Sequence, residues 1–348
     1  MKPSTAVGLA AALFAGVVPL RCMSQDVPEG LTAVEGLRVG HFSLPQSATG
    51  CTVVIAEGGA TAGGDVRGGA PGTVETDLLD PVNSVSFVNA VVLSGGSAFG
   101  LAARDGVVRY LEELGEGYPV GRDMVVPIVT GAIIFDLSVN PPGVRPDSDC
   151  GYRAATAASS ARPDEGSVGA GSGATVGKMR GMDRAMKGGL GTASITLESG
   201  LVVAALIVVN AVGDVVDPAT GTVVAGVRGT GGGFADARRL LREQAPLDSP
   251  GANTTIGVVA TNARLTKAEA NKVAQMAQDG LARAIVPSHT PSDGDTMFSL
   301  ATGALEDGFT VSQVGALAAE AVADAILRAV RTATGLPGIP AVRELPGS

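Results

Sequence analysis

The chain has 348 residues, which is enough for one large domain or two domains of ordinary size. Glycine (50) and proline (20) are abundant, but apolar runs separate them, which argues against a low-complexity protein. A net charge of −9 without any basic cluster argues against nucleic-acid binding and against docking on an anionic membrane surface.

The first 24 residues predict a leader segment. Met1 and Lys2 give a weakly basic start, and the apolar run at 6–20 is too short to span a bilayer comfortably. This pattern predicts export, with a periplasmic or secreted mature protein that is not held in the membrane. If Met23 is instead the true start, the protein would be cytoplasmic. Export would allow Cys51 and Cys150 to form a disulfide, whereas two cysteines without close spacing do not make a metal site.

The rest of the chain predicts strands that alternate with helices. Strands are expected at 31–41, 51–56, 84–93, 128–137 and 194–209, with a hairpin at 217–227. Helices are expected at 98–114, 266–284 and 312–332, the second of which begins with a Thr266/Glu269 capping box. The glycine-rich stretch at 58–72 predicts a loop that lines a site, and the polar stretch at 236–251 predicts an exposed linker. Because many strands are apolar throughout, we expect sheets covered on both faces, in a layered α/β sandwich.

One stretch, Asn253-Thr254-Thr255-Ile256-Gly257-Val258-Val259-Ala260-Thr261-Asn262, predicts a loop that feeds directly into a buried strand. A hydroxyl at the start of that strand would be rigid and accessible from the loop side. Cleavage between Asn253 and Thr254 would give Thr254 a free α-amine with a pKa of about 7.7–8, which could accept the proton of its own hydroxyl. Thr254 would then supply both nucleophile and base. The alternative is a turn that merely precedes a strand.

Asp293-Gly294-Asp295 is a second candidate element of a site. Two carboxylates two residues apart can point the same way from an extended segment, and Gly294 permits a close turn. Such a pair could hold a new ammonium group and tune its pKa. The alternative is a polar turn.

These two motifs, the second continuing as Thr296-Met297-Phe298-Ser299-Leu300, resemble the self-cleaving aminopeptidase family. That family includes the L-aminopeptidase/D-amidase-esterases, the β-peptidyl aminopeptidases and the nylon-oligomer hydrolase. The likeness runs from about Gly30 to about Gly335. With aspartate at both 293 and 295, the chain resembles the threonine-nucleophile branch rather than the branches that carry Ser and Glu in that role.

The resemblance implies a four-layer α-β-β-α sandwich of the N-terminal-nucleophile type, cut into a larger fragment (25–253) and a smaller one (254–348) within one catalytic domain. It implies that Lys178 is an active-site lysine whose charge helps to keep the α-amine neutral, and that Asn210 stabilises the oxyanion. Phe135 falls where some relatives carry a tyrosine, so one hydroxyl would be missing.

The resemblance further implies homo-oligomers of processed heterodimers, with no metal and no organic cofactor. Substrates would be short peptides or peptide-like amides, including β-peptides and 6-aminohexanoate oligomers. An acyltransferase of the ornithine-acetyltransferase type and a non-catalytic binding protein on the same scaffold are the alternatives.

Other schemes fit the residues poorly. The segment at 169–178 fails the phosphate-loop pattern at Ser172 and Met179. His41 and His289 are the two histidines of the chain, so a Ser-His-Asp triad would have to use one of them.

Overall fold

The computed structural model describes residue 1 and residues 29–121, 124–243 and 253–345. The leader predicted at 1–24 therefore lies outside the described residues, apart from Met1. Within the described ranges, no helix is long and apolar enough to cross a membrane.

Among the described residues, eight strands form one hydrogen-bonded path, and a ninth, β1 (Leu37–Ser43), pairs with the long strand β2 (Gly50–Val66) beside that path. Strand β2 takes part in both of the two stacked sheets that this path forms. The first sheet is built on the first half of β2 with β1, β4 (Val88–Ser94), β7 (Val129–Ile133) and β3 (Thr73–Val74). The second is built on its second half with β16 (Thr296–Leu305), β14 (Thr254–Ala263), β11 (Val202–Asn210) and β10 (Gly189–Thr196). The pairing of β2 with β4 shifts register between Ile55 and Ala60, where β2 leaves the first sheet for the second.

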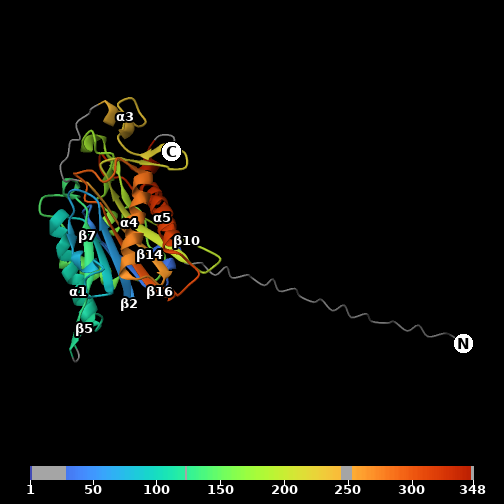
Figure 1. The fold of residues 1–348 in the computed structure, drawn as a ribbon. Coiled ribbons are helices and arrows are strands. Elements are labelled where there is room, and N and C mark those ends of the chain that lie inside the picture. Colours follow the sequence, from blue (N-terminus) through green and yellow to red (C-terminus); the bar gives the residue numbers. More distant parts are fainter. Residues whose placement is uncertain (2–28, 122–123, 244–252, 346–348) are drawn as a thin grey trace.

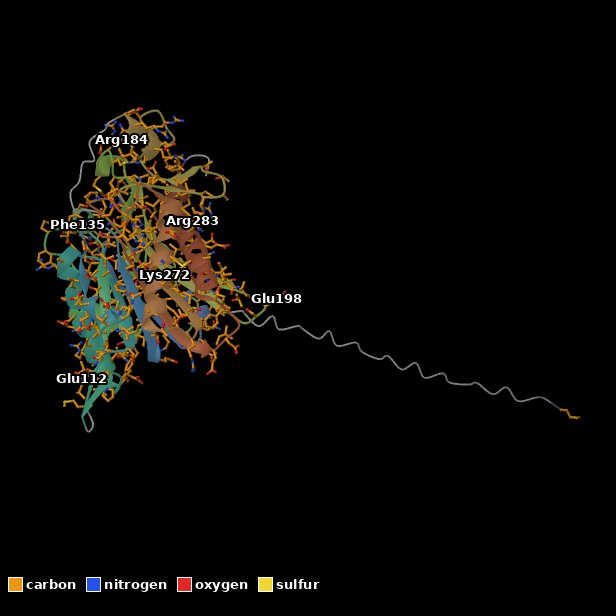
Figure 2. The ribbon with its side chains drawn as sticks, in the orientation of Figure 1. Glu112, Phe135, Arg184, Glu198, Lys272 and Arg283 are labelled. Carbon is orange, nitrogen blue, oxygen red and sulfur yellow. A yellow bond between two sulfur atoms is a disulfide. The ribbon has the colours of Figure 1, made fainter. Side chains whose placement is uncertain are left out.

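Helices cover the outer faces of both sheets. The helices α1 (Ala103–Glu113) and α2 (Ser148–Thr156) pack on the first sheet, and α4 (Lys267–Ala284) and α5 (Val311–Thr332) pack on the second. Figure 1 shows α1 on one side of the two sheets and α4 and α5 on the other, and Figure 2 shows side chains filling the space between the layers. The predicted four-layer α-β-β-α sandwich is confirmed.

The sequence of β11 is apolar at successive positions, and the packing of the strand explains this pattern. Val203, Ala205 and Ile207 pack under α4 and α5, whereas their neighbours Leu206 and Val208 lie in the core between the sheets. Both faces of the strand are therefore buried, as the apolar run predicts.

Shorter elements connect these layers. In the part of the chain that the structure describes, seven are 3-10 helices: η1 (Leu31–Ala33), η2 (Asp77–Leu79), η3 (Ser97–Ala102), η4 (Leu137–Val139), η5 (Gly169–Gly171), η6 (Met182–Arg184) and η7 (Val342–Glu344). The others are α3 (Ala237–Arg242), β5 (Tyr118–Gly121), β6 (Met124–Val126), β8 (Thr175–Val176), β9 (Met186–Lys187), β12 (Asp214–Val216), β13 (Val223–Ala225) and β15 (Ile285–Val286).

The glycine-rich stretch at 58–72 is a loop only from residue 67 onward, because residues 58–66 continue β2. The small residues there serve close packing. A Cβ at Gly63 would lie 2.3 Å from the backbone nitrogen of Asn271, so glycine lets α4 lie directly on the strand.

The stretch at 236–251 is also not a linker throughout. It begins with α3, which buries Ala237 and Leu240, and the buried Asp214 carboxylate accepts hydrogen bonds from the backbone nitrogens of Ala237 and Val227. These contacts fix the segment to the body as far as Glu243, and residues 244–252 lie outside the described part of the chain.

Three further differences concern element boundaries. The helix expected at 98–114 starts as η3 before α1, the strand expected at 194–209 is the β10–β11 pair, and α2 was not predicted. The capping box of α4 is confirmed at Thr266 and Glu269. Cys51 of β2 and Cys150 of α2 form a disulfide with a Cα–Cα distance of 6.0 Å.

Candidate active site

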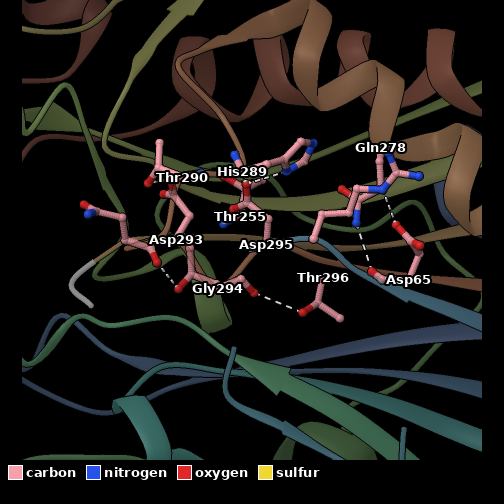
Figure 3. Close-up of polar contacts among 12 residues, drawn as sticks. Asp65, Thr255, Gln278, His289, Thr290, Asp293, Gly294, Asp295 and Thr296 are labelled. Carbon is pink, nitrogen blue, oxygen red and sulfur yellow. Dashed lines mark hydrogen bonds and ion pairs between the residues drawn. The ribbon is translucent and has the colours of Figure 1, made fainter. Parts of the chain in front are cut away.

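Thr254 is the first residue of β14 and lies where three segments of the second sheet meet. It pairs with Asn210, the last residue of β11, in an antiparallel ladder. On the other side, β14 runs parallel to β16, and Asn253 bridges to Asp293 just before β16 begins. The pairing of strands thus brings Thr254 beside residues distant in sequence. Figure 3 shows Asp293, Gly294 and Asp295 beside Thr255, the next residue of β14.

The peptide bond between Asn253 and Thr254 is intact in this structure, and its carbonyl oxygen has two donors. The backbone nitrogen of Gly294 donates to it at 3.0 Å, and the Thr254 hydroxyl donates to it as well. Thr254 is 3% exposed and Asn253 is 1% exposed. The expectation of a hydroxyl accessible from the loop side is therefore wrong for the uncut chain, because Asn253 is itself held in the strand pairing.

Gly294 can approach this peptide because it has no side chain. A Cβ at Gly294 would lie 2.9 Å from Thr254 Oγ1 and 2.9 Å from the carbonyl oxygen of Ala70. Gly68 is similarly constrained, since its Cβ would lie 2.2 Å from the carbonyl oxygen of Asp293. The loop after β2 does line the site, as predicted.

The Asp295 carboxylate is anchored on backbone nitrogens. Its Oδ1 accepts a hydrogen bond from the Thr255 nitrogen at 2.7 Å, and its Oδ2 accepts one from the His289 nitrogen at 2.9 Å. The imidazole Nδ1 of His289 also lies 2.9 Å from Oδ2. Asp295 therefore fixes the backbone of the residue that follows the candidate nucleophile.

The Asp293 carboxylate has different partners. Its Oδ2 accepts hydrogen bonds from the Thr290 nitrogen at 3.0 Å and from the Thr290 hydroxyl. Burial, together with the charge of Asp295, raises the pKa of Asp293 to about 6. Asp293 is thus a carboxyl group that can gain or lose a proton near neutral pH.

Lys178 is buried rather than on the surface, being 2% exposed. Its ammonium group donates to the backbone oxygen of Asn210 at 2.9 Å and to Asn210 Oδ1 at 3.0 Å. Burial lowers its pKa to about 7, and the charges of nearby carboxylates, Asp293 first, oppose that shift. Lys178 therefore contacts the site through its hydrogen bonds to Asn210, which is the strand partner of Thr254.

The side-chain amide of Asn210 is oriented by its neighbours. Its Oδ1 accepts hydrogen bonds from the Thr175 nitrogen at 3.0 Å and from Lys178, so its Nδ2 is directed the other way. Nδ2 donates to the backbone oxygen of Phe135 at 3.1 Å. Position 135 thus contributes a main-chain oxygen to the site.

Sequence reasoning missed the roles of Gly294 N, Thr290, His289 and Lys187. Lys187 is completely buried, and its ammonium group donates to the carbonyl oxygens of Gly171, Ala174 and Gly188 at 2.8, 2.9 and 3.2 Å. No spacing rule distinguishes such a lysine from a surface lysine, because two of its three partners, Gly171 and Ala174, are backbone atoms of a separate segment.

The five predicted side chains, Thr254, Lys178, Asn210, Asp293 and Asp295, are therefore gathered at one end of the second sheet. Together with the backbone N–H of Gly294, they bring a hydroxyl, an amide nitrogen, two carboxylates and an amine of lowered pKa to this end of the sheet, and acyl transfer uses groups of these kinds. Among the described residues, no group of three or more His, Cys, Asp or Glu side chains is arranged to hold a metal ion.

Comparison with known sequences identifies relatives over most of the chain. The model of peptidase family S58 matches residues 29–342. An uncharacterized aminopeptidase of Mycobacterium tuberculosis is 48% identical over 347 residues, covering 91% of this chain and 98% of the relative. A 6-aminohexanoate-oligomer endohydrolase of Agromyces sp. is 32% identical over 310 residues, covering 84% of each.

Solved structures share the fold. A β-aminopeptidase of Burkholderia sp. superposes with a TM-score of 0.64 at 24% identity, covering 87% of this chain and 86% of that one. The L-aminopeptidase D-Ala-esterase/amidase of Ochrobactrum anthropi, described as a variant of the N-terminal-nucleophile hydrolase fold, gives a TM-score of 0.65 at 18% identity, covering 89% and 88%. The chain belongs to peptidase family S58 and is a hydrolase of peptide or amide bonds.

Proposed function

We propose that this hydrolase cuts itself between Asn253 and Thr254 and then uses Thr254 as an N-terminal nucleophile. The larger fragment would comprise 25–253 and the smaller one 254–348. The observation that carries the proposal is the pair of donors on the carbonyl oxygen of Asn253, namely the Thr254 hydroxyl and the Gly294 backbone N–H.

In self-cleavage, Thr254 Oγ attacks the carbonyl carbon of Asn253. The Gly294 N–H stabilises the oxyanion that forms on the carbonyl oxygen. The C–N bond then breaks, the Asn253 acyl group passes to Oγ as an ester, and the released nitrogen takes up the hydroxyl proton. Water hydrolyses the ester to give the carboxylate of Asn253 and a free α-amine on Thr254.

In turnover, Thr254 Oγ attacks the substrate amide while the α-amine accepts its proton and later delivers it to the leaving amine. The α-amine has an ordinary pKa of about 7.7–8, so it can act as a base near neutral pH. Asn210 Nδ2 donates to the oxyanion, and water releases the acyl group. Asp293 and Asp295 hold the amine, and the charge of Lys178 favours its neutral form.

The substrates that fit this chemistry are short peptides or peptide-like amides. The names of the relatives, aminopeptidase and 6-aminohexanoate-oligomer endohydrolase, support this class, and the second extends it to 6-aminohexanoate oligomers. We propose β-peptides as a further group because the resemblance of the sequence motifs implies them. The missing hydroxyl at Phe135 would give a substrate range different from that of enzymes with a tyrosine there.

We further propose that processed pairs assemble into homo-oligomers and that the protein is exported to the periplasm or beyond. The Cys51–Cys150 disulfide supports export, because disulfides persist in oxidising compartments.

Mass spectrometry of the purified protein tests self-cleavage. We expect a new N-terminus at Thr254 in the wild type, and one uncut chain without hydrolase activity in Thr254→Ala, since the nucleophile is gone. Thr220→Ala, in an exposed turn, is the matched control and should be cut normally. A wild-type chain that stays uncut on storage would contradict the proposal and favour a binding protein. Predominant acyl transfer to an added amine, rather than to water, would favour an acyltransferase.

A further inference from the structure

His289 contacts Asp295 of the candidate site from its more exposed side and has no role in the mechanism above. It lies between β15 and β16, and both its backbone nitrogen and its Nδ1 are 2.9 Å from Asp295 Oδ2. The other oxygen of that carboxylate accepts the Thr255 N–H at 2.7 Å. The histidine side chain is 20% exposed and that of Asp295 is 2% exposed, so the imidazole connects a partly solvated position to the buried carboxylate (Figure 3).

The groups around the imidazole favour its charged form. Asp295 presents a carboxylate, and α4 presents the backbone carbonyl of Gln278 as an acceptor. Arg67, the first residue after β2, is the opposing positive charge, and it pairs with Asp65 at 2.7 Å. Although burial alone would lower it, the pKa of His289 is raised by the hydrogen bond and the charge of Asp295.

The positive neighbour of Asp293 is Lys178. Burial and the charge of Asp295 raise the pKa of the Asp293 carboxyl to about 6, although the charge of Lys178 lowers it. The hydrogen bonds to its Oδ2 come from the backbone and hydroxyl of Thr290, which are neutral donors. Two carboxylates that share a site do not ionise equally. The carboxylate whose negative charge is less stabilised by nearby positive charges and hydrogen-bond donors retains its proton to higher pH.

We propose that His289 is a positioning residue: its imidazole holds Asp295 Oδ2, so that Oδ1 stays directed at the Thr255 N–H, and its positive charge favours placing the exchangeable proton of the carboxylate pair on Asp293. This inference rests on the proposed function, because the pair acts on Thr254. The hydrogen bond and charge of Asp295 raise the pKa of His289, which favours the imidazolium in the range where Asp293, with a pKa of about 6, titrates.

The pH dependence of hydrolysis by the processed enzyme tests the proposal. His289→Asn removes the charge but keeps a donor near the Nδ1 position, and asparagine tolerates the positive φ of 56° at this residue. Loss of the positive charge raises the pKa of the neighbouring groups that must lose a proton for activity. The acidic limb of the pH–rate profile should therefore move up by about one pH unit. The plateau rate should change little.

His41→Asn is the matched control, because His41 is the other histidine of the chain. Its Nδ1 lies 2.9 Å from Thr52 Oγ1, and burial lowers its pKa to about 4, so it is neutral in the range tested. This variant should keep the wild-type profile. An unshifted profile in His289→Asn, or an equal loss of rate at every pH, would overturn the proposal.

A nuclear magnetic resonance titration needs no activity and covers the case in which His289→Asn does not fold. In the His41→Asn, Thr254→Ala chain, the remaining imidazole signal belongs to His289. We expect it to titrate above the ordinary value of about 6.5, and to move down when Asp295→Asn is added. A pKa at or below the ordinary value would overturn the proposal. An uncut wild-type chain would instead defeat the proposed function while leaving this titration valid.

Discussion

The carbonyl oxygen of Asn253 is the point on which the candidate chemistry converges. Gly294 donates its backbone N–H to that oxygen. The Thr254 hydroxyl, which would attack the same peptide, lies 2.9 Å from the position that a Cβ at Gly294 would occupy. A residue with no side chain is therefore part of the site, through its backbone N–H and through the space it leaves.

Gly294→Ala should slow self-cleavage on the order of 100-fold, because the new methyl group would lie 2.9 Å from Thr254 Oγ1 and displace the nucleophile. The time course of fragment appearance on a denaturing gel measures this. Gly231→Ala is the control, since a Cβ there meets nothing within 4 Å. Equal cleavage rates for both variants would show that the Gly294 contact has no role.

At this scale the motifs in the sequence predict only part of the site. Thr254 and the two aspartates could be named because they stand in recognisable stretches, and Lys178 and Asn210 through the resemblance. His289 and the Gly294 N–H could not be found in this way. Their contacts arise from the parallel pairing of β14 with β16, which places residues 253–255 beside 289–295.

The glycine-rich segment at 169–178 is the element that orients Asn210. Lys187 holds the carbonyls of Gly171 and Ala174, and the next residue, Thr175, donates its N–H to Asn210 Oδ1. A buried ammonium group thus fixes the backbone on which the oxyanion donor depends. Burial lowers the pKa of Lys187 to about 7, and the charge of Asp136 opposes this shift.

Lys187→Met should destabilise the fold by about 3 kcal/mol or more, because three buried carbonyls lose their donor. Urea unfolding of the Thr254→Ala chain measures this in a single covalent chain. Self-cleavage should also slow in the Thr254 form as Thr175 loses its position. Lys272→Met, on the exposed face of α4, should stay within about 0.5 kcal/mol. A Lys187→Met chain as stable as this control would refute the role given to the ammonium group.

Elements were predictable where periodicity or capping was explicit, as in α4 and α5. The stretch at 58–66 was misjudged because its glycines indicate a loop, whereas the structure uses them to let α4 contact β2. Helix α3 was missed for a related reason: its two buried residues, Ala237 and Leu240, are too few to give a clear apolar period.

At the scale of the molecule, the cleavage point stands at the start of a central strand. Strand β14 has β11 on one side and β16 on the other, and its Ile256, Val258 and Val259 are at most 1% exposed. Each such side chain contributes about 1.5–3 kcal/mol relative to exposure. Cutting one peptide bond at the end of this strand removes none of these contacts.

The two fragments should therefore remain one particle after processing. We expect them to elute together in native size-exclusion chromatography and to separate only in denaturant. A denaturing gel should show two bands with or without reductant, because Cys51 and Cys150 both precede residue 254 and the disulfide cannot join the fragments. Release of the smaller fragment without denaturant would contradict this, since it would require β14 and β16 to leave a sheet in which each is paired on both edges.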